Sequence, residues 1–233
     1  MSKKSKKSAK AALPETSVEE QNGDTLEEAA VAIEMPESLD GKSVEALPQE
    51  NGEKLVKKKV IVKGILAGEK VITEASDEAR EFYNQSRFGI LTENSKVELS
   101  LLEGLYLLEK GKLSLKSDHG KKLTFELYLK KAREAEPNFW IRYCVFKDIR
   151  NRGYIIKTAL KFGADFRVYD RGVKPGEDHA RWIVYPVHEG NTLTWYEFAA
   201  KNRVAHSTKK RLLIGIVDDE GDVTYYEIRW MRP

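Results

Sequence analysis

The first 55 residues limit what this chain can fold into, because they contain no aromatic side chain. Ser, Ala, Glu and Pro dominate the segment, and a Lys-rich tip at residues 3–10 precedes a run of acidic residues. Such a composition buries too little apolar surface to offset the entropy lost on ordering. We therefore predict a disordered acidic tail at residues 1–55, with the folded part of the chain beginning near Val56.

The charges of the chain are divided unevenly between this tail and the rest. Residues 1–53 carry six Lys and twelve acidic residues, whereas residues 54–233 carry 34 basic and 25 acidic residues. The foldable part is therefore basic, which favours a polyanionic partner such as a nucleic acid.

Several classes of protein are disfavoured by what the sequence lacks. The single Cys144 excludes an intrachain disulfide and a zinc site built from clustered cysteines. No run of about 18 apolar residues is present, as a transmembrane helix would require, and the basic start lacks the apolar stretch of a secretory signal. We therefore expect a cytoplasmic protein that does not contact a membrane.

The common cofactor and metal motifs are also missing. The sequence contains no GxxxxGK[ST], GxGxxG or GxSxG stretch and no His pair at metal-ligand spacing. We therefore expect no bound cofactor and no metal site.

Residues 56–135 have the pattern of a small α/β domain, with two short strands followed by three helices. The strands flank a turn at Gly68, and Ser76 has the position of a helix N-cap. The expected elements are strands at 60–62 and 70–72 and helices from Ser76 to near Gly89, from Val97 to Lys110 and at about 124–134.

Residues 136–233 have the pattern of a second domain, in which helices flank a mixed sheet. Gly153 ends its first helix, and Thr194-x-x-Glu197 is a capping box for its second. The expected elements are helices at 138–152 and 194 to about 203 and strands at 154–158, 164–169, 181–187, 210–217 and 223–230. The predicted fold class is α/β, an α+β arrangement with a mixed sheet.

Three polar clusters could carry chemistry. Alternation along the stretch 165–169 places Tyr169 on the polar side of a strand end. His179 follows a loop of turn formers and acids, which predicts an exposed side chain that can be protonated near neutral pH. The basic run from His206 to Arg211 leads into an apolar strand and offers phosphate contacts.

Each cluster also has a plainer interpretation. A tyrosine at a strand end usually only packs, and a loop histidine is often incidental, with His119, His188 and His206 as competitors here. Basic residues beside an apolar strand often serve only to prevent aggregation.

A longer run of residues resembles the archaeal tRNA-splicing endonucleases, the tRNA-intron endonuclease family. The resemblance extends over residues 56–233 and is carried by ordered matches rather than by one motif. The main matches are Tyr154-x-x-Lys157-Thr158-x-x-Lys161-Phe162-Gly163-Ala164-Asp165-Phe166-Arg167-Val168-Tyr169, Arg171-Gly172, His179-Ala180, Glu189-Gly190, Arg203-Val204-Ala205-His206-Ser207 and Lys209-Lys210.

The resemblance implies that residues 136–233 form a catalytic domain with a Tyr–His–Lys triad. Position matching assigns the triad to Tyr169, His179 and Lys210. Lys209 is the alternative to Lys210, because the family's motif ends in two neighbouring basic residues.

The family also uses two side chains to hold a flipped-out bulge base. Position matching assigns Arg203 to the first of them. Trp230 is the expected second, and Arg229 is its rival because the family varies there between Arg and an aromatic residue.

The implied reaction excises introns from precursor tRNA at bulge-helix-bulge junctions, with the ribose 2′-OH as nucleophile. Tyr169 would act as general base and His179 as general acid, while Lys210 would stabilise the charge of the transition state. Tyrosine phenols in general ionise near pH 10, so the base needs a cation nearby. The products would be a 2′,3′-cyclic phosphate and a 5′-OH, and no metal ion or cofactor takes part.

Two cuts need two active sites at a fixed separation, which a symmetric oligomer provides. The family assembles as dimers of dimers, with an acidic loop of one subunit inserted in a basic groove of another. The matching loop residues here are Asp218, Asp219, Glu220 and Asp222. The chain suits a homotetramer or the catalytic subunit of a heterotetramer. The alternative, a non-catalytic structural or RNA-binding subunit, has no need of a complete triad.

Overall fold

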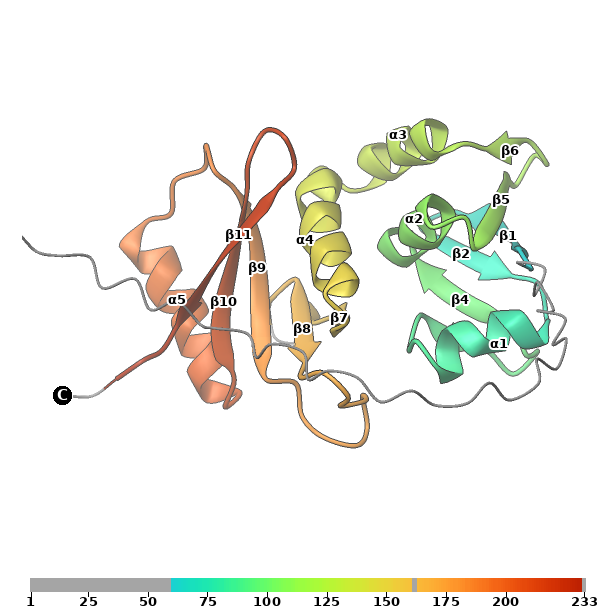
Figure 1. Ribbon diagram of the computed structural model, residues 1–233. Coiled ribbons are helices and arrows are strands. Elements are labelled where there is room, and N and C mark those ends of the chain that lie inside the picture. Colours follow the sequence, from blue (N-terminus) through green and yellow to red (C-terminus); the bar gives the residue numbers. More distant parts are fainter. Residues whose placement is uncertain (1–59, 161–162, 232–233) are drawn as a thin grey trace, which may run out of the picture. The chain divides into compact units, whose positions relative to one another are not determined.

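The computed structural model describes residues 60–160 and 163–231, all within one compact unit of the chain. The tail predicted at residues 1–55 lies outside the described residues. In the described part, five helices accompany two mixed sheets (Figure 1). The fold class predicted from the sequence is confirmed.

The first sheet has six strands in the order β3-β4-β2-β1-β5-β6. Strands β1 and β5 are parallel, and every other pair is antiparallel. Its strands are β1 Val62–Ala67, β2 Lys70–Thr73, β3 Ile90–Leu91, β4 Val97–Ser100, β5 Leu113–Ser117 and β6 Lys122–Leu123. The accompanying helices are α1 Asp77–Asn84, α2 Leu101–Glu109 and α3 Phe125–Ala135.

The prediction of a helix from Val97 to Lys110 is wrong for its first four residues, which form a strand. Val97 and Leu99 are buried and alternate with more exposed neighbours, so this stretch pairs as strand β4. Helix α2 begins only after Ser100, whose hydroxyl accepts the backbone N–H of Glu103 while the Glu103 carboxylate accepts the N–H of Ser100. This capping box marks the boundary between strand and helix.

The N-cap predicted at Ser76 is confirmed, because its hydroxyl accepts the N–H of Ala79 over 3.1 Å. The helix that it caps is shorter than predicted. It ends at Asn84 rather than near Gly89, which instead leads into the short strand β3.

The second sheet has five strands in the order β11-β10-β9-β8-β7. Strands β9 and β10 are parallel, and the other neighbours are antiparallel. Its strands are β7 Ile155–Thr158, β8 Phe166–Tyr169, β9 Trp182–His188, β10 Arg211–Val217 and β11 Val223–Ile228. Its helices are α4 Phe139–Asn151 and α5 Trp195–Ser207, so α5 is about one turn longer than predicted.

Helices α4 and α5 cover opposite faces of the second sheet (Figure 1). On the α4 side, a Cβ added at Gly215 would lie 3.0 Å from Val145, so glycine allows the helix to approach the middle of β10. On the α5 side, Ile183, Leu212 and Ile214 form a separate buried cluster.

One buried core links the two sheets through α2 and α4. Ring contacts run across this core from Tyr106 of α2 to Phe146 of α4 and on to Phe166 of β8, with centroid distances of 5.9 Å and 6.2 Å. Strand β8 is therefore held firmly against the rest of the fold. None of the helices in the described residues combines the length and apolar character needed to cross a lipid bilayer.

Candidate active site

Strand β8 directs Arg167 and Tyr169 away from the buried core. Phe166 and Val168 are 1% and 2% exposed and pack with the α4 side of the sheet. Alternation places Arg167 and Tyr169 on the other face, where both line one pocket. The predicted division of this strand into two faces is confirmed, although Tyr169 is itself only 4% exposed.

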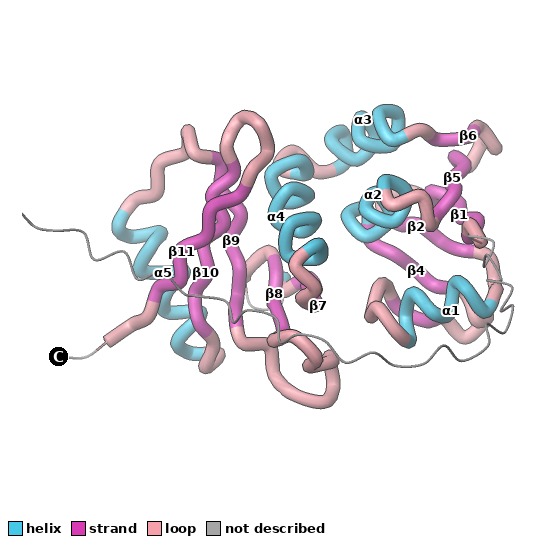
Figure 2. Tube along the Cα trace, in the orientation of Figure 1, coloured by secondary structure: helices cyan, strands magenta, loops and turns pink. Residues whose placement is uncertain are grey.

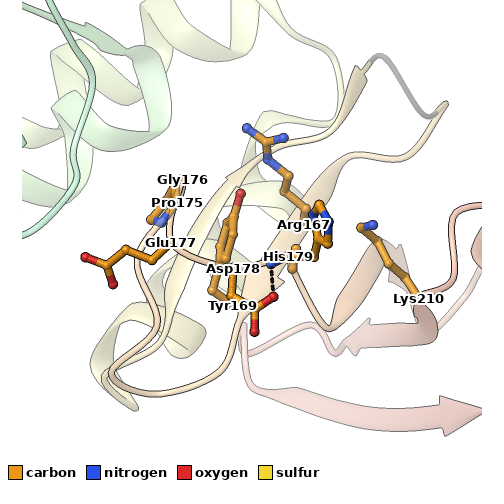
Figure 3. Close-up of a pocket in the computed structure, with 9 residues that line it drawn as sticks. Arg167, Tyr169, Pro175, Gly176, Glu177, Asp178, His179 and Lys210 are labelled. Atoms are coloured by element: carbon orange, nitrogen blue, oxygen red, sulfur yellow. Dashed lines mark hydrogen bonds between the residues drawn. The ribbon is translucent and has the colours of Figure 1, made fainter.

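The loop between β8 and β9 brings His179 to the same pocket. Gly172 and Gly176 have φ angles of 82° and 98°, which residues with a side chain rarely adopt. His179 is exposed, as predicted, and its backbone N–H donates to Asp178 Oδ1 over 2.6 Å (Figure 3). The N–H of Arg181 then donates to a carbonyl of β8, which returns the chain to the sheet.

The turn after α5 determines where Lys210 lies. Thr208 is the C-cap of the helix, and Lys209 follows in the left-handed conformation with a φ of 54°. The N–H of Lys209 donates to the carbonyl of His206 over 3.0 Å, and the N–H of Lys210 to that of Ala205 over 2.8 Å. These two bonds are those of a Schellman motif, and they place Lys210 directly before β10.

Tyr169, His179 and Lys210 line one pocket of about 390 Å³, although they come from three separate segments. In Figure 3 the Lys210 side chain extends toward His179, while the ring of Tyr169 lies on the other side of the pocket. Lys209 is not among the lining residues. The other residues that line the pocket are Arg167, Pro175, Gly176, Glu177, Asp178 and Ala180.

The three other histidines lie outside this pocket. His119 is exposed in the turn between β5 and β6. The Nε2 atom of His188 lies 3.0 Å from Asp219 Oδ1, and the ring of His206 packs against Trp230. His179 is therefore the histidine that the fold brings to Tyr169.

Helix α5 carries Arg203 on an exposed face near Trp230. Arg203 is exposed on this helix, and His206 follows it by three residues, so the two share a face. The ring centroids of His206 and Trp230 are 4.6 Å apart, and Trp230 is 48% exposed. Its rival Arg229 instead donates from Nε to Glu227 Oε1 over 2.8 Å.

Glu227 holds Arg229 as part of a larger group of polar contacts. Burial opposes the ionisation of Glu227, but hydrogen bonds from Trp182, Arg229 and Arg211 outweigh burial and lower its pKa to about 2. The carboxylate is therefore charged at neutral pH and binds Arg229 electrostatically.

The acidic loop at 218–222 is the hairpin between β10 and β11, as predicted. Asp218 Oδ1 accepts the backbone N–H of Asp222 over 2.8 Å, which stabilises the turn. Asp219, Glu220 and Asp222 are exposed. Figure 2 shows this hairpin at the opposite end of the second sheet from the loop that carries His179. The seven residues of β10 correspond to roughly 20 Å between the two ends.

A groove of about 800 Å³ is lined by residues of both sheets, and its charges are largely paired within the chain. Its paired cations are Lys70 with Glu98, Lys157 with Glu103, and Arg142 with Glu136 and Asp165. Arg167 lines both this groove and the pocket. An acidic loop from another subunit would therefore meet fewer available cations in this groove than the net charge of the chain suggests.

The sequence patterns do not single out Arg167 or Glu103. Arg167 precedes Tyr169 by two residues, so strand alternation alone places both on one face. Glu103 follows Ser100 by three residues, the spacing of a capping box. The alternation already places Arg167 beside Tyr169 from the sequence alone, whereas the capping box at Ser100 is recognisable only when the boundary between β4 and α2 is known.

Comparison with protein families gives two matches along the chain. Residues 62–129 match the profile of the tRNA intron endonuclease N-terminal domain. Residues 139–225 match that of the tRNA intron endonuclease catalytic C-terminal domain, and this range includes Tyr169, His179 and Lys210.

Curated archaeal proteins are similar over most of their length. A tRNA-splicing endonuclease of Nanoarchaeum equitans is 49% identical over 142 residues, covering 58% of this chain and 90% of that protein. Those of Thermococcus onnurineus and Methanothermobacter thermautotrophicus are each 40% identical, over 72% and 74% of this chain and 95% and 99% of theirs. This chain therefore belongs to the tRNA intron endonuclease family of enzymes.

Proposed function

We propose that this chain excises introns from precursor tRNA by cutting the RNA at bulge-helix-bulge junctions, without a metal ion. The observation that carries the proposal is the convergence of Tyr169, His179 and Lys210 on one pocket. The similar archaeal proteins, which are named tRNA-splicing endonucleases, support the substrate class.

In the proposed reaction, the ribose 2′-oxygen attacks the adjacent phosphorus atom. Tyr169, as a phenolate, accepts the proton of the 2′-OH while the bond from O2′ to phosphorus forms. The bond from phosphorus to O5′ breaks, and His179, as an imidazolium, donates a proton to the leaving oxygen. The products are a 2′,3′-cyclic phosphate and a 5′-OH. Because the RNA supplies its own nucleophile, the reaction requires no metal-activated water.

Lys210 stabilises the negative charge that develops on the phosphoryl oxygens. Its Nζ atom donates to the carbonyl of Thr208 over 3.0 Å, so the turn that places the backbone of Lys210 also positions its ammonium group. A cation held in advance is more effective than a mobile one, because it needs no reorganisation during the reaction.

Arg203 and Trp230 hold the bulged base away from the strand that is cut. A planar guanidinium and an indole can each stack on a nucleobase. The contact between His206 and Trp230 orients the indole beside the face of α5 that carries Arg203. The splayed backbone then reaches the in-line geometry that attack by the 2′-oxygen requires.

The chain acts as a homotetramer, a dimer of dimers, or as the catalytic subunit of a heterotetramer. The acidic residues of the β10–β11 hairpin contact a neighbouring subunit. Supporting this, the hairpin lies at the end of the sheet opposite the loop that carries His179, and its residues Asp219, Glu220 and Asp222 are exposed (Figure 2).

The direct test is cleavage of an intron-containing precursor tRNA by the purified protein in excess EDTA, followed by analysis of the RNA ends. The expected result is cutting at both junctions with 2′,3′-cyclic phosphate and 5′-OH termini. Dependence on added Mg²⁺, or 3′-OH products, would contradict the mechanism. Tight RNA binding without cleavage would instead identify a structural subunit.

A further inference from the structure

We propose that Arg167 is a fourth functional side chain of the pocket and binds the phosphate group at the cleavage site. The inference rests on the proposed function, because it assumes that an RNA phosphate enters this pocket.

The position of Arg167 follows from that of Tyr169. Both belong to β8 and point to the same face, and both line the pocket with His179 and Lys210. The Arg167 Cζ atom lies 5.9 Å from the centre of the Tyr169 ring. Figure 3 shows the guanidinium on the side of the pocket where the Tyr169 hydroxyl lies, whereas Lys210 enters from another side. A phosphate within reach of the triad is therefore within reach of Arg167 as well.

Among the residues that the structure describes, no acidic group compensates the charge of Arg167. Within residues 60–160 and 163–231, its guanidinium forms no ion pair and no hydrogen bond, and its Nε atom is buried. Other cations in this part of the groove, such as Lys157, do have carboxylate partners. A partly buried cation without a counter-ion costs stability, so its presence is better explained by an anion that binds there.

The neighbour of Arg167 on the next strand increases this cost. Lys157 pairs with Arg167 in the register between β7 and β8. Burial lowers the pKa of Lys157, Glu103 opposes the change, and the charges of Arg150 and Arg167 add to the lowering. The positive charges of Lys157 and Arg167 therefore repel one another between β7 and β8. Of the two, only Lys157 has an acidic partner among the described residues.

The chemistry of a guanidinium fits a phosphate. Its planar set of donors can bind two oxygens of one phosphate at once, and such charge-assisted bonds are stronger than neutral ones. During attack by the 2′-oxygen, both non-bridging oxygens of the phosphate gain negative charge. Lys210 and Arg167 together supply donors from two sides of the pocket.

A carboxylate from a second copy of the chain is the competing partner, because Arg167 also lines the groove. The phosphate is favoured because Arg167 shares its strand face with Tyr169 and lines the pocket of about 390 Å³ with the triad. The two partners predict different effects of mutation, one on cleavage within an intact assembly and the other on the assembly itself.

The test compares Arg167→Gln and Arg167→Lys with the wild type and with Arg80→Gln, which removes the same charge from exposed helix α1. We expect Arg167→Gln to slow single-turnover cleavage of precursor tRNA in EDTA by about 100-fold. Arg167→Lys keeps the positive charge but lacks the planar guanidinium that can bind two phosphate oxygens, so it should retain part of the cleavage activity. Arg80→Gln should cleave like the wild type.

Two further readouts separate this role from a structural one. The Tm of Arg167→Gln should equal or exceed that of the wild type, because the substitution removes a cation that lies beside Lys157 and has no acidic partner among the described residues. Sulfate, as a phosphate probe, should raise the Tm of the wild type more than that of Arg167→Gln. Sedimentation should show that the assembly of the variant is unchanged.

Each outcome supports or overturns the inference. If Arg167→Gln cleaves at the wild-type rate, or if it is slow only because its assembly has dissociated, the inference is wrong and the proposed function stands. If the wild type itself fails to cleave, the proposed function fails. The sulfate measurement then decides whether Arg167 binds a phosphate-like anion, and equal sulfate shifts for wild type and variant would overturn the inference.

Discussion

Lys210 donates its backbone N–H to the carbonyl oxygen of Ala205 over 2.8 Å, and this bond closes the turn between α5 and β10. Lys209 lies inside the turn in the left-handed conformation, with a φ of 54°. For a residue with a Cβ, this conformation is less favourable than for glycine by about 1 kcal/mol of free energy. The turn therefore distinguishes the two lysines, because only the side chain of Lys210 lines the pocket.

Lys209→Gly should retain cleavage and stabilise the fold by about 1 kcal/mol, because glycine adopts the left-handed conformation without strain. Lys210→Ala should bind precursor tRNA nearly as well as the wild type but slow the chemical step by at least about 100-fold. Single-turnover cleavage and urea unfolding measure the two effects. If the glycine variant loses cleavage while Lys210→Ala keeps it, the two lysines have been assigned in the wrong order.

His179→Ala should likewise reduce the chemical step by about 100-fold or more while leaving RNA affinity nearly unchanged, because it removes the proposed proton donor. The matched control is His119→Ala, which removes an exposed histidine in the turn between β5 and β6 and should cleave like the wild type. Tyr169→Phe removes only the hydroxyl and should be comparably slow. Cleavage at the wild-type rate by either pocket variant would show that the corresponding role is wrong.

The sequence was informative where a local rule decides the structure. The capping box at Thr194 and Glu197 predicted the start of α5, and alternation predicted which side chains of β8 face the core. The start of α2 was predicted wrongly, because apolar residues at helical spacing run on from the apolar residues of β4. Only the pairing of β4 with β2 and β3 resolves that ambiguity.

The pocket itself could not be derived from local patterns. Tyr169, His179 and Lys210 come from three segments, and strand pairing brings those segments together: Arg181 N–H bonds to β8, and Arg211 N–H bonds to the carbonyl of Arg181. Their grouping was inferred from a family resemblance. The domain boundary near residue 135 stays a prediction, since one buried core runs through α2 and α4 to both sheets.

Trp230→Ala should weaken binding of bulged RNA by about 1–3 kcal/mol, the usual contribution of stacking between a base and an aromatic side chain. Arg203→Ala should act in the same direction. Arg229→Ala should have less effect on the bulge, because this arginine is engaged by Glu227. Titration of the variants with a bulged RNA and with a continuous duplex separates base holding from general charge attraction. An equal loss of affinity for the bulged RNA and for the duplex would argue against a role in holding the base.

The double variant Asp219→Asn, Glu220→Gln should dissociate the assembly at moderate salt, because it removes exposed charges from the hairpin. Asp218 is left in place, since its carboxylate accepts the N–H of Asp222 and supports the turn. The control, Asp118→Asn with Glu126→Gln, makes the same charge change elsewhere on the surface. Sedimentation of the three proteins is the measurement, and an unchanged wild-type assembly in the hairpin variant would refute the contact.

The carboxylate of Glu103 is buried between the two sheets. It accepts the backbone N–H of Gly89 over 2.9 Å and lies 3.1 Å from the Lys157 Nζ atom. Burial opposes ionisation, but the charge of Lys157 and the backbone hydrogen bonds from Gly89 and Ser100 outweigh it and lower the pKa of Glu103 below its ordinary 4.5. Because the pKa is lower in the folded state than in the unfolded state, the resulting stability is present above about pH 4.5 and is lost as pH falls below it.

Glu103→Gln should therefore reduce the free energy of unfolding at pH 7 by about 3 kcal/mol, because Lys157 is left as a buried cation without its partner. The control Glu98→Gln breaks the more exposed pair with Lys70 and should cost less than about 1 kcal/mol. In urea unfolding at a series of pH values, the difference between wild type and Glu103→Gln should shrink as pH falls below 4.5. A difference that stays constant down to pH 3 would mean that the charge of Glu103 does not stabilise the fold.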